Sequence, residues 1–204
     1  MPLRNRVTPL GEIVAVGERG LVYGNRGCLH DASGRIVRRQ ATKRWIACRL
    51  AFRGWYRTPV PQPGRYTGLF FLDDATALAA GHRPCALCRR EDYRRVLGTL
   101  GVSGAEELDA LLAGERNGPR PTVPVAGLPD GAFVLHDGAP NLVRSGALRR
   151  WTAGGYDAPV AAPPAAPLVT PPSLVRVLRE GWTPVVPFIG PALAEDGPAS
   201  PGGS

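Results

Sequence analysis

Lysine is almost absent from this sequence, and long apolar segments are missing altogether. Of the 25 basic residues only Lys43 is a lysine, so arginine supplies nearly all of the positive charge. There is no run of about 18 apolar residues, the length that a transmembrane helix needs. The N-terminal stretch MPLRNRVTPLGEIV lacks the apolar core of a secretory signal. We therefore expect a cytosolic protein with reduced thiols and no membrane partner.

Aromatic residues are scarce, and the common catalytic signatures are missing. Aromatic residues make up 7% of the chain and hydrophobic residues 44%, which predicts a lean core. The 26 glycines and 22 prolines form just under a quarter of the 204 residues, which predicts short elements and many loops. The sequence contains no HExxH motif, no nucleophile elbow and no phosphate-binding glycine loop. No catalytic residue is assigned.

The formal net charge of +8 favours an anionic partner such as nucleic acid. Two arginine-rich stretches carry much of it, around residues 38–49 and 83–95. The codon bias of a GC-rich genome and a solvated surface explain part of this excess. As nucleic-acid contacts we predict the arginines that flank the cysteines described below: Arg44, Arg49, Arg83, Arg89 and Arg90.

The first 100 residues indicate a small sheet followed by helices. Short β-type runs occur over residues 12–72 (IVAV, LVY, CLH, RIV, WIACRLAF and YTGLFFL), with a proline-rich loop over 58–64. Asp73 or Asp74 is a suitable cap for a helix DATALAA that ends at Gly81. A second helix is predicted over REDYRRVLGTL. A third, GAEELDALLAG, has the capping-box spacing of Ser103 and Glu106.

The second half differs in composition, since 16 of the 22 prolines follow residue 118. We predict a β segment over GAFVLHDGAPNLVRSGALRRWT, an Ala/Pro linker over 158–167 and a helix in TPPSLVRVLREG. The predicted organisation is a zinc-binding domain over 1–118, a smaller β-hairpin and helix segment over 119–189, and a disordered tail over 190–204. The fold class is α+β, with a small antiparallel sheet, short helices and a zinc knuckle.

All four cysteines lie in the first half of the chain. Cys85 and Cys88 form a CxxC pair in GHRPCALCRR, which is compatible with a redox pair or with half of a metal site. A thioredoxin-like pair follows a strand and opens a long helix, whereas this pair follows a short helix and a glycine turn. Structural Zn²⁺ sites use four Cys or His ligands. Cys48, in a predicted strand, is the expected third ligand.

The predicted fourth ligand is Cys28, which the count of cysteines favours, and His30 is the alternative; the two lie two residues apart on one face of a predicted strand. Cys28 could equally serve as a small apolar side chain buried in the core. His30 could equally stabilise its own turn together with Asp31. His82, three residues before Cys85, is a further alternative. Residues 28–45 and 134–151 are similar enough to be a repeat. The second copy has no cysteine, which weakens both Cys28 and His30 as ligands.

The stretch FFLDDATALAAGHRPCALCRRED, within about residues 66–92, resembles the metal-binding domain of Ada-type DNA-alkylation repair regulators. The resemblance implies that Cys85 and Cys88 are zinc thiolates, and that the preceding helix packs over a small antiparallel sheet. The family has a closely spaced first cysteine pair, and one member of it accepts a methyl group. Cys28 and Cys48 do not match that pair, so no acceptor role carries over. His82 stands where the family has an aromatic residue.

Three functions are compatible with these features. The first, which we favour, is a Zn²⁺-binding protein whose structural site supports nucleic-acid binding, to DNA rather than RNA. The second is a zinc-thiolate methyl acceptor, in which a zinc-bound thiolate is the nucleophile, or a zinc-dependent enzyme, in which a zinc with only three protein ligands activates water. The third is a zinc-stabilised domain that binds a protein partner through the proline-rich second half.

Overall fold

The computed structural model describes residues 2–56 and 64–187. Over this part of the chain it has four α-helices and sheets of six, four, two and two strands, which confirms the predicted α+β class. The predicted tail over 190–204, and the predicted proline-rich loop except for Gly64, lie outside the described residues.

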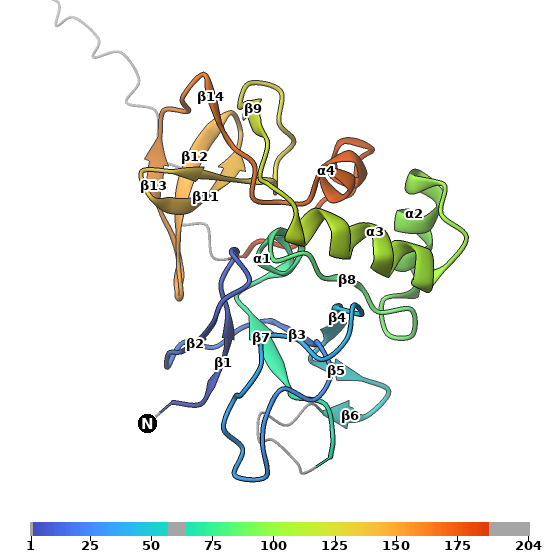
Figure 1. Cartoon of the computed structure of the whole chain (residues 1–204). Helices are drawn as coiled ribbons and strands as arrows, with labels where there is room; N and C mark the ends of the chain where they lie inside the picture. Colours follow the sequence, from blue (N-terminus) through green and yellow to red (C-terminus); the bar gives the residue numbers. More distant parts are fainter. Residues whose placement is uncertain (1, 57–63, 188–204) are drawn as a thin grey trace, which may run out of the picture.

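The N-terminal half forms one six-stranded sheet in the order β2-β1-β7-β3-β4-β8 (Figure 1). Strands β1 and β7 pair in parallel, as do β4 and β8, and the other neighbours are antiparallel. The sheet is therefore mixed, whereas the sequence predicts an antiparallel one. Its strands are β1 (Arg4–Val7), β2 (Ile13–Ala15), β3 (Val22–Asn25), β4 (Ile46–Arg49), β7 (Leu69–Phe71) and β8 (Arg83–Pro84), and a separate pair comprises β5 (Ala51–Phe52) and β6 (Trp55–Tyr56).

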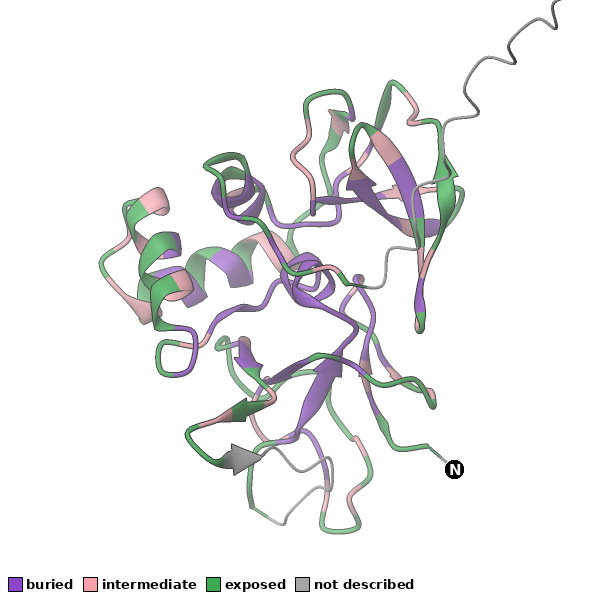
Figure 2. Ribbon diagram, turned by 180° about the vertical axis from the view of Figure 1, so that it is seen from behind, coloured by how far each residue is buried: buried purple, intermediate pink, exposed green. Residues whose placement is uncertain are grey.

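Helix α1 (Asp74–Ala79) lies between this sheet and the C-terminal strands (Figure 1). All of its residues are buried, as Figure 2 shows, and its alanines allow close approach from several sides. The Asp73 carboxylate caps it by accepting a hydrogen bond of 2.8 Å from the Thr76 amide. Gly81 ends it with a φ of +80°. The predicted helix and both of its ends are thus confirmed.

The second half contains a four-stranded antiparallel meander and a two-stranded pair; the predicted β segment covers the first three strands of the meander, and the other strands were not predicted. None of the helices in the described residues is both long enough and apolar enough to cross a membrane. The remaining elements are α2 (Arg90–Leu100), α3 (Ala105–Asn117), α4 (Pro172–Arg179), the meander β10 (Phe133–His136), β11 (Ala139–Arg144), β12 (Ala147–Thr152) and β13 (Gly155–Val160), and the pair β9 (Thr122–Pro124) and β14 (Ala165–Pro167).

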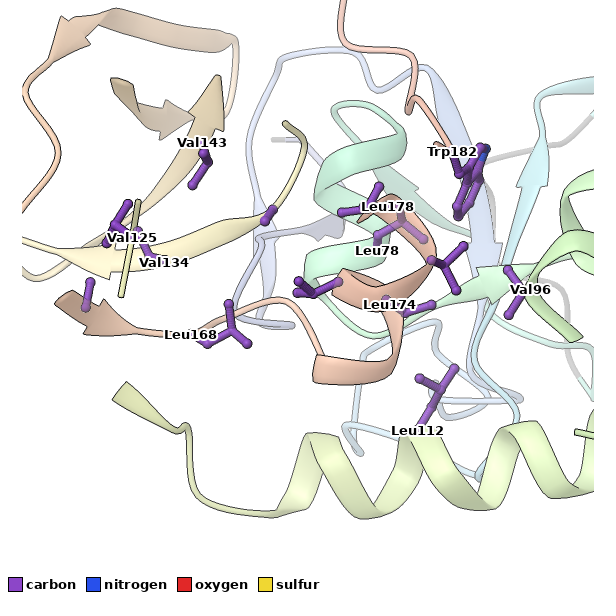
Figure 3. Close-up of a cluster of buried hydrophobic side chains, with 14 of the residues drawn as sticks. Leu78, Val96, Leu112, Val125, Val134, Val143, Leu168, Leu174, Leu178 and Trp182 are labelled. Carbon is purple, nitrogen blue, oxygen red and sulfur yellow. The ribbon is translucent and has the colours of Figure 1, made fainter. Parts of the chain in front are cut away.

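One hydrophobic cluster joins all four helices to the C-terminal strands (Figure 3). It contains Leu78 of α1, Val96 of α2, Leu112 of α3, Leu174 of α4 and Val134 of β10. Residues on both sides of position 118 therefore share a core. The domain boundaries drawn from the sequence stay a prediction. Within the stretch 158–167, predicted as a linker, the residues at both ends belong to strands β13 and β14.

Two local details differ from the sequence-based expectation. The N-cap of α3 is Gly104, not Ser103. The amide and hydroxyl of Ser103 each donate a hydrogen bond of 2.8 Å to Glu107, not to Glu106. The carboxylate that accepts these hydrogen bonds at the start of α3 therefore belongs to Glu107, one residue after the predicted Glu106.

The similar stretches 28–45 and 134–151 fold differently. The first, which contains the predicted strands CLH and RIV, has one isolated bridge between His30 and Ile36. The second forms the paired strands β10, β11 and most of β12. The sequence similarity therefore does not correspond to a repeated structure.

Candidate metal centre

Strand β4 and the loop after β8 bring the cysteines together. Cys48 lies on β4 opposite Tyr23 of β3. The other edge of β4 pairs with β8, where Ala47 lies opposite Pro84. The amide of Cys85 donates a hydrogen bond of 2.9 Å to the Ala47 carbonyl. The CxxC loop therefore begins directly beside the strand that carries the third cysteine.

Cys48, Cys85 and Cys88 form a group that can hold a metal ion. Their three sulfur atoms all lie within 4.8 Å of one another. In a tetrahedral zinc thiolate site with Zn–S bonds of about 2.3 Å, the sulfurs are roughly 3.8 Å apart. A small contraction around an ion brings the three atoms to that spacing. Three soft sulfur donors suit Zn²⁺ and exclude the hard cations Mg²⁺ and Ca²⁺.

Backbone amides point at two of the sulfurs. The Arg49 amide donates to Cys88 Sγ over 3.4 Å, and the Leu87 amide donates to Cys85 Sγ over 3.5 Å. Such donors stabilise thiolates, which are the form that binds metal. Hydrogen bonds from Cys48 and Cys88 lower the pKa of Cys85, and hydrogen bonding with Cys85 and Cys88, together with burial, raises the pKa of Cys48. The protonation of each thiol therefore depends on its two sulfur neighbours.

Apolar side chains surround the group on the side of the sheet. Tyr23 and Phe70 pack edge to face, with ring centroids 5.4 Å apart, and both belong to the hydrophobic cluster that contains Cys48 and Cys88. Leu87, between the paired cysteines, is 53% exposed. The cysteine group is therefore packed against apolar side chains on the side of the sheet, and it reaches the protein surface at Leu87, at the tip of the CxxC loop.

Two arginines beside the CxxC pair are buried in ion pairs. The Arg83 guanidinium binds Asp109 of α3 with bonds of 2.7 and 3.0 Å. Arg89 binds both carboxylate oxygens of Asp74, at the start of α1, and also contacts Asp92 at 3.0 Å. These two guanidinium groups, predicted as nucleic-acid contacts, are thus engaged by carboxylates within the protein.

The other three predicted contact residues, Arg44, Arg49 and Arg90, are exposed. Arg49 follows the candidate ligand Cys48 directly, and Arg90 begins α2, two residues after Cys88. Both therefore lie at the rim of the cysteine group, with guanidinium groups free to meet solvent or a ligand.

The two candidates for the fourth ligand are not members of the cysteine group. The Cys28 thiol lies 3.7 Å from the carbonyl oxygen of His30, to which it donates. The His30 ring is buried and contacts the Thr67 hydroxyl at 2.6 Å. His82 is also outside the group: its Nε2 lies 3.2 Å from Arg26. In the described residues the chain brings together three sulfur ligands.

A cavity of about 470 Å³ adjoins the centre, and sequence reasoning did not find it. Its walls include Cys48, Asp73, Asp74, Arg89 and Trp182. Burial raises the pKa of Asp73, whose carboxylate accepts a hydrogen bond of 2.7 Å from the Tyr156 hydroxyl. The one sequence feature that pointed to this cavity was the adjacent pair Asp73 and Asp74. The sequence analysis interpreted that pair only as a helix cap.

No family model matches this sequence, and neither a curated protein nor a solved structure matches it. Of the resemblance to Ada-type metal-binding domains, the structure bears out the three-cysteine group alone.

Proposed function

We propose that this protein binds Zn²⁺ through Cys48, Cys85 and Cys88, and that the ion is chiefly structural. The observation that carries the proposal is the convergence of three sulfurs from a strand and a loop that are 37 residues apart in sequence. Binding energy of about 10 kcal/mol or more is available to folding when no metal site exists in the unfolded chain. This stabilisation by the metal is important because the strands of the six-stranded sheet are only two to four residues long.

We further propose that the surface around the centre binds nucleic acid, with DNA as the expected form. Arg49 and Arg90 flank the cysteines, and Arg94 is exposed four residues after Arg90, on the same face of α2. This arrangement supports contact with phosphates.

The nucleic-acid proposal is tested by binding a fluorescent DNA duplex over a series of salt concentrations. The logarithm of the association constant should fall linearly with the logarithm of salt. Replacing Arg49 or Arg90 by Gln should reduce the magnitude of that slope by about one for each phosphate that the variant fails to neutralise. The matched control is Arg19→Gln, another exposed arginine, which should leave the slope unchanged. Binding that is independent of salt would exclude the proposal.

The metal proposal is tested by thermal unfolding in the presence of a strong chelator. The metal stabilises only the folded state, so its removal should lower the melting temperature. Adding Zn²⁺ back should restore it, whereas Mg²⁺ should not. An unchanged melting temperature after complete chelation would exclude a structural metal.

A second candidate function follows from the number of ligands. Three protein sulfurs leave one position of a tetrahedral ion for an outside ligand. With Zn²⁺ bound, Cys48, Cys85 and Cys88 would be held as thiolates, and one of these sulfurs could attack the methyl carbon of a methylated phosphate, with the C–O bond breaking and the phosphodiester anion leaving. Incubation with DNA that carries methylphosphotriesters should then add one methyl group to a cysteine, measured by mass spectrometry. An unchanged mass would dismiss this candidate.

A further inference from the structure

A second site lies away from the cysteines, around the side chains of Arg26 and Trp45. Arg26 is fully buried at 0% exposure. It donates to the Gly11 carbonyl over 2.8 Å and to His82 over 3.2 Å. Within the part of the chain that the structure describes, no carboxylate forms an ion pair with it, and its Nη2 has no hydrogen-bond partner. A buried cation without an anion is costly in a finished fold.

Two further arginines gather at the same place. The guanidinium carbon of Arg26 lies 3.6 Å from the centre of the Trp45 ring system, and that of Arg116 lies 4.3 Å from it. The Nη2 atoms of Arg26 and Arg39 both lie within 4 Å of the position that a Cβ on Gly11 would take. Three positive charges therefore surround one indole. Burial and then repulsion from Arg39 and Arg116 lower the pKa of Arg26. Burial lowers the pKa of Arg116 to about 10, against the attraction of Asp109 and Glu115.

An open pocket of about 690 Å³ reaches this cluster at Arg39, Trp45 and Arg116, while Arg26 lies outside its lining. Arg39, Trp45 and Arg116 line it, together with Arg120 and one acidic residue, Glu115. The Glu115 carboxylate is already engaged, since it accepts hydrogen bonds from the amide and hydroxyl of Ser173. The pocket thus has an excess of positive charge.

Two residues of the pocket wall carry buried donors without a partner among the described residues. These are Nε1 of Trp45, whose side chain is 2% exposed, and Nε of Arg116. The other two guanidinium nitrogens of Arg116 donate to the carbonyls of Gly81 and Lys43, which holds the group in place. Buried donors are almost always paired in folded proteins, so these two show that the protein alone leaves hydrogen-bonding capacity unfilled beside the pocket.

We propose that this pocket binds a phosphate group, carried by a small ligand such as inorganic phosphate or a nucleoside monophosphate. A phosphate dianion offers several acceptor oxygens for the guanidinium groups of Arg39, Arg116 and Arg120, which line the pocket. Its charge offsets the repulsion among Arg26, Arg39 and Arg116. A carboxylate ligand has one charge and two oxygens, and balances this cluster less well. The site involves none of the cysteines and none of the arginines proposed above to contact nucleic acid.

The test is calorimetric titration of the full chain with inorganic phosphate and, separately, with a nucleoside 5′-monophosphate. We expect saturable binding at millimolar or lower concentration. Binding of both ligands assigns the site to the phosphate group itself. Binding of the nucleotide alone shows that base or sugar contributes. Either result supports the site, and no saturable binding of either ligand would overturn it.

The matched variants are Arg39→Gln and Arg38→Gln, since both residues are exposed neighbours and only Arg39 lines the pocket. Arg39→Gln should weaken binding by about tenfold, the effect of losing one charge-assisted hydrogen bond. Arg38→Gln should leave binding unchanged, and equal losses in the two variants would reject the assignment. In the wild-type protein, the indole N–H resonance of Trp45 should shift on titration. A shift confined to the other tryptophans would also contradict the proposal.

Discussion

The guanidinium of Arg89 binds both carboxylate oxygens of Asp74, the first residue of α1. Arg89 directly follows the metal-ligand candidate Cys88, so this pair fastens the cysteine loop to the central helix. The Asp74 carboxylate also lies 3.3 Å from the Val185 amide, which donates to it. One side chain thus connects the cysteine loop to the C-terminal segment.

We predict that Asp74→Asn destabilises the protein by about 3 kcal/mol, because it leaves the buried Arg89 charge only partly compensated by Asp92. Urea denaturation gives the free energy of unfolding. The control is Asp130→Asn, since the Asp130–Arg144 pair is 3.4 Å long and about two-fifths exposed on both sides. That exposed pair should contribute less than about 1 kcal/mol. Equal losses in the two variants would contradict the structural role of the Arg89–Asp74 pair.

Gly24 of β3 is predicted to tolerate no side chain, because β3 lies between β4 and β7. A Cβ there would lie 2.3 Å from the Ile46 carbonyl oxygen and 2.8 Å from the Phe71 ring. Gly24→Ala should therefore cost about 1–3 kcal/mol by forcing the strands apart. Gly98→Ala, in the exposed part of α2 with no atom within 4 Å, should stabilise by about 0.5–1 kcal/mol. Thermal unfolding of both variants distinguishes these opposite signs.

The buried carboxyl of Asp73 should make stability depend on pH. Burial raises its pKa above the ordinary value of 3.8, so the folded state binds this proton more tightly than the unfolded chain does. The resulting stabilisation is present below pH 3.8 and is lost as pH rises through the folded-state pKa. Asp73→Asn keeps an oxygen for the Thr76 amide but does not titrate.

The measurement is the free energy of unfolding of wild type and Asp73→Asn over a pH series that starts below 3.8. Wild type should lose stability relative to the variant as pH rises. Because metal release at low pH affects both proteins, the difference between them isolates the carboxyl. A difference that does not change with pH, or that changes in the opposite direction, would refute this prediction.

Helix α1 and the three-cysteine group were predictable because their signals are local or chemically specific. Asp73 and Gly81 mark the ends of α1 by capping chemistry, and the CxxC pair, with Cys48 in a predicted strand nearby, supplies the three members of the group. Strand β1 was missed because its sequence, RNRV, alternates arginine with other residues and resembles a polar terminus. It is a strand because it pairs with β7, which lies more than 60 residues away in sequence.

The arginines show the limit of composition as a guide to function. In the sequence, Arg83 and Arg89 are close to the cysteines and resemble phosphate contacts. Their ion-pair partners are Asp109 of α3 and Asp74 of α1, which the sequence does not reveal. Arg26, with no acidic partner in the described residues, had no sequence signal at all. Whether a cation is paired depends on tertiary contacts, which spacing along the chain does not reveal.

The most direct test of the metal centre is the metal content of the purified protein and of two cysteine variants, by elemental mass spectrometry. Cys48→Ser removes a member of the group, whereas Cys28→Ser removes the cysteine outside it. We predict one zinc per chain in wild type and in Cys28→Ser, and strong loss of zinc in Cys48→Ser. Metal-free wild type, or equal zinc content in the two variants, would contradict a centre built on Cys48, Cys85 and Cys88.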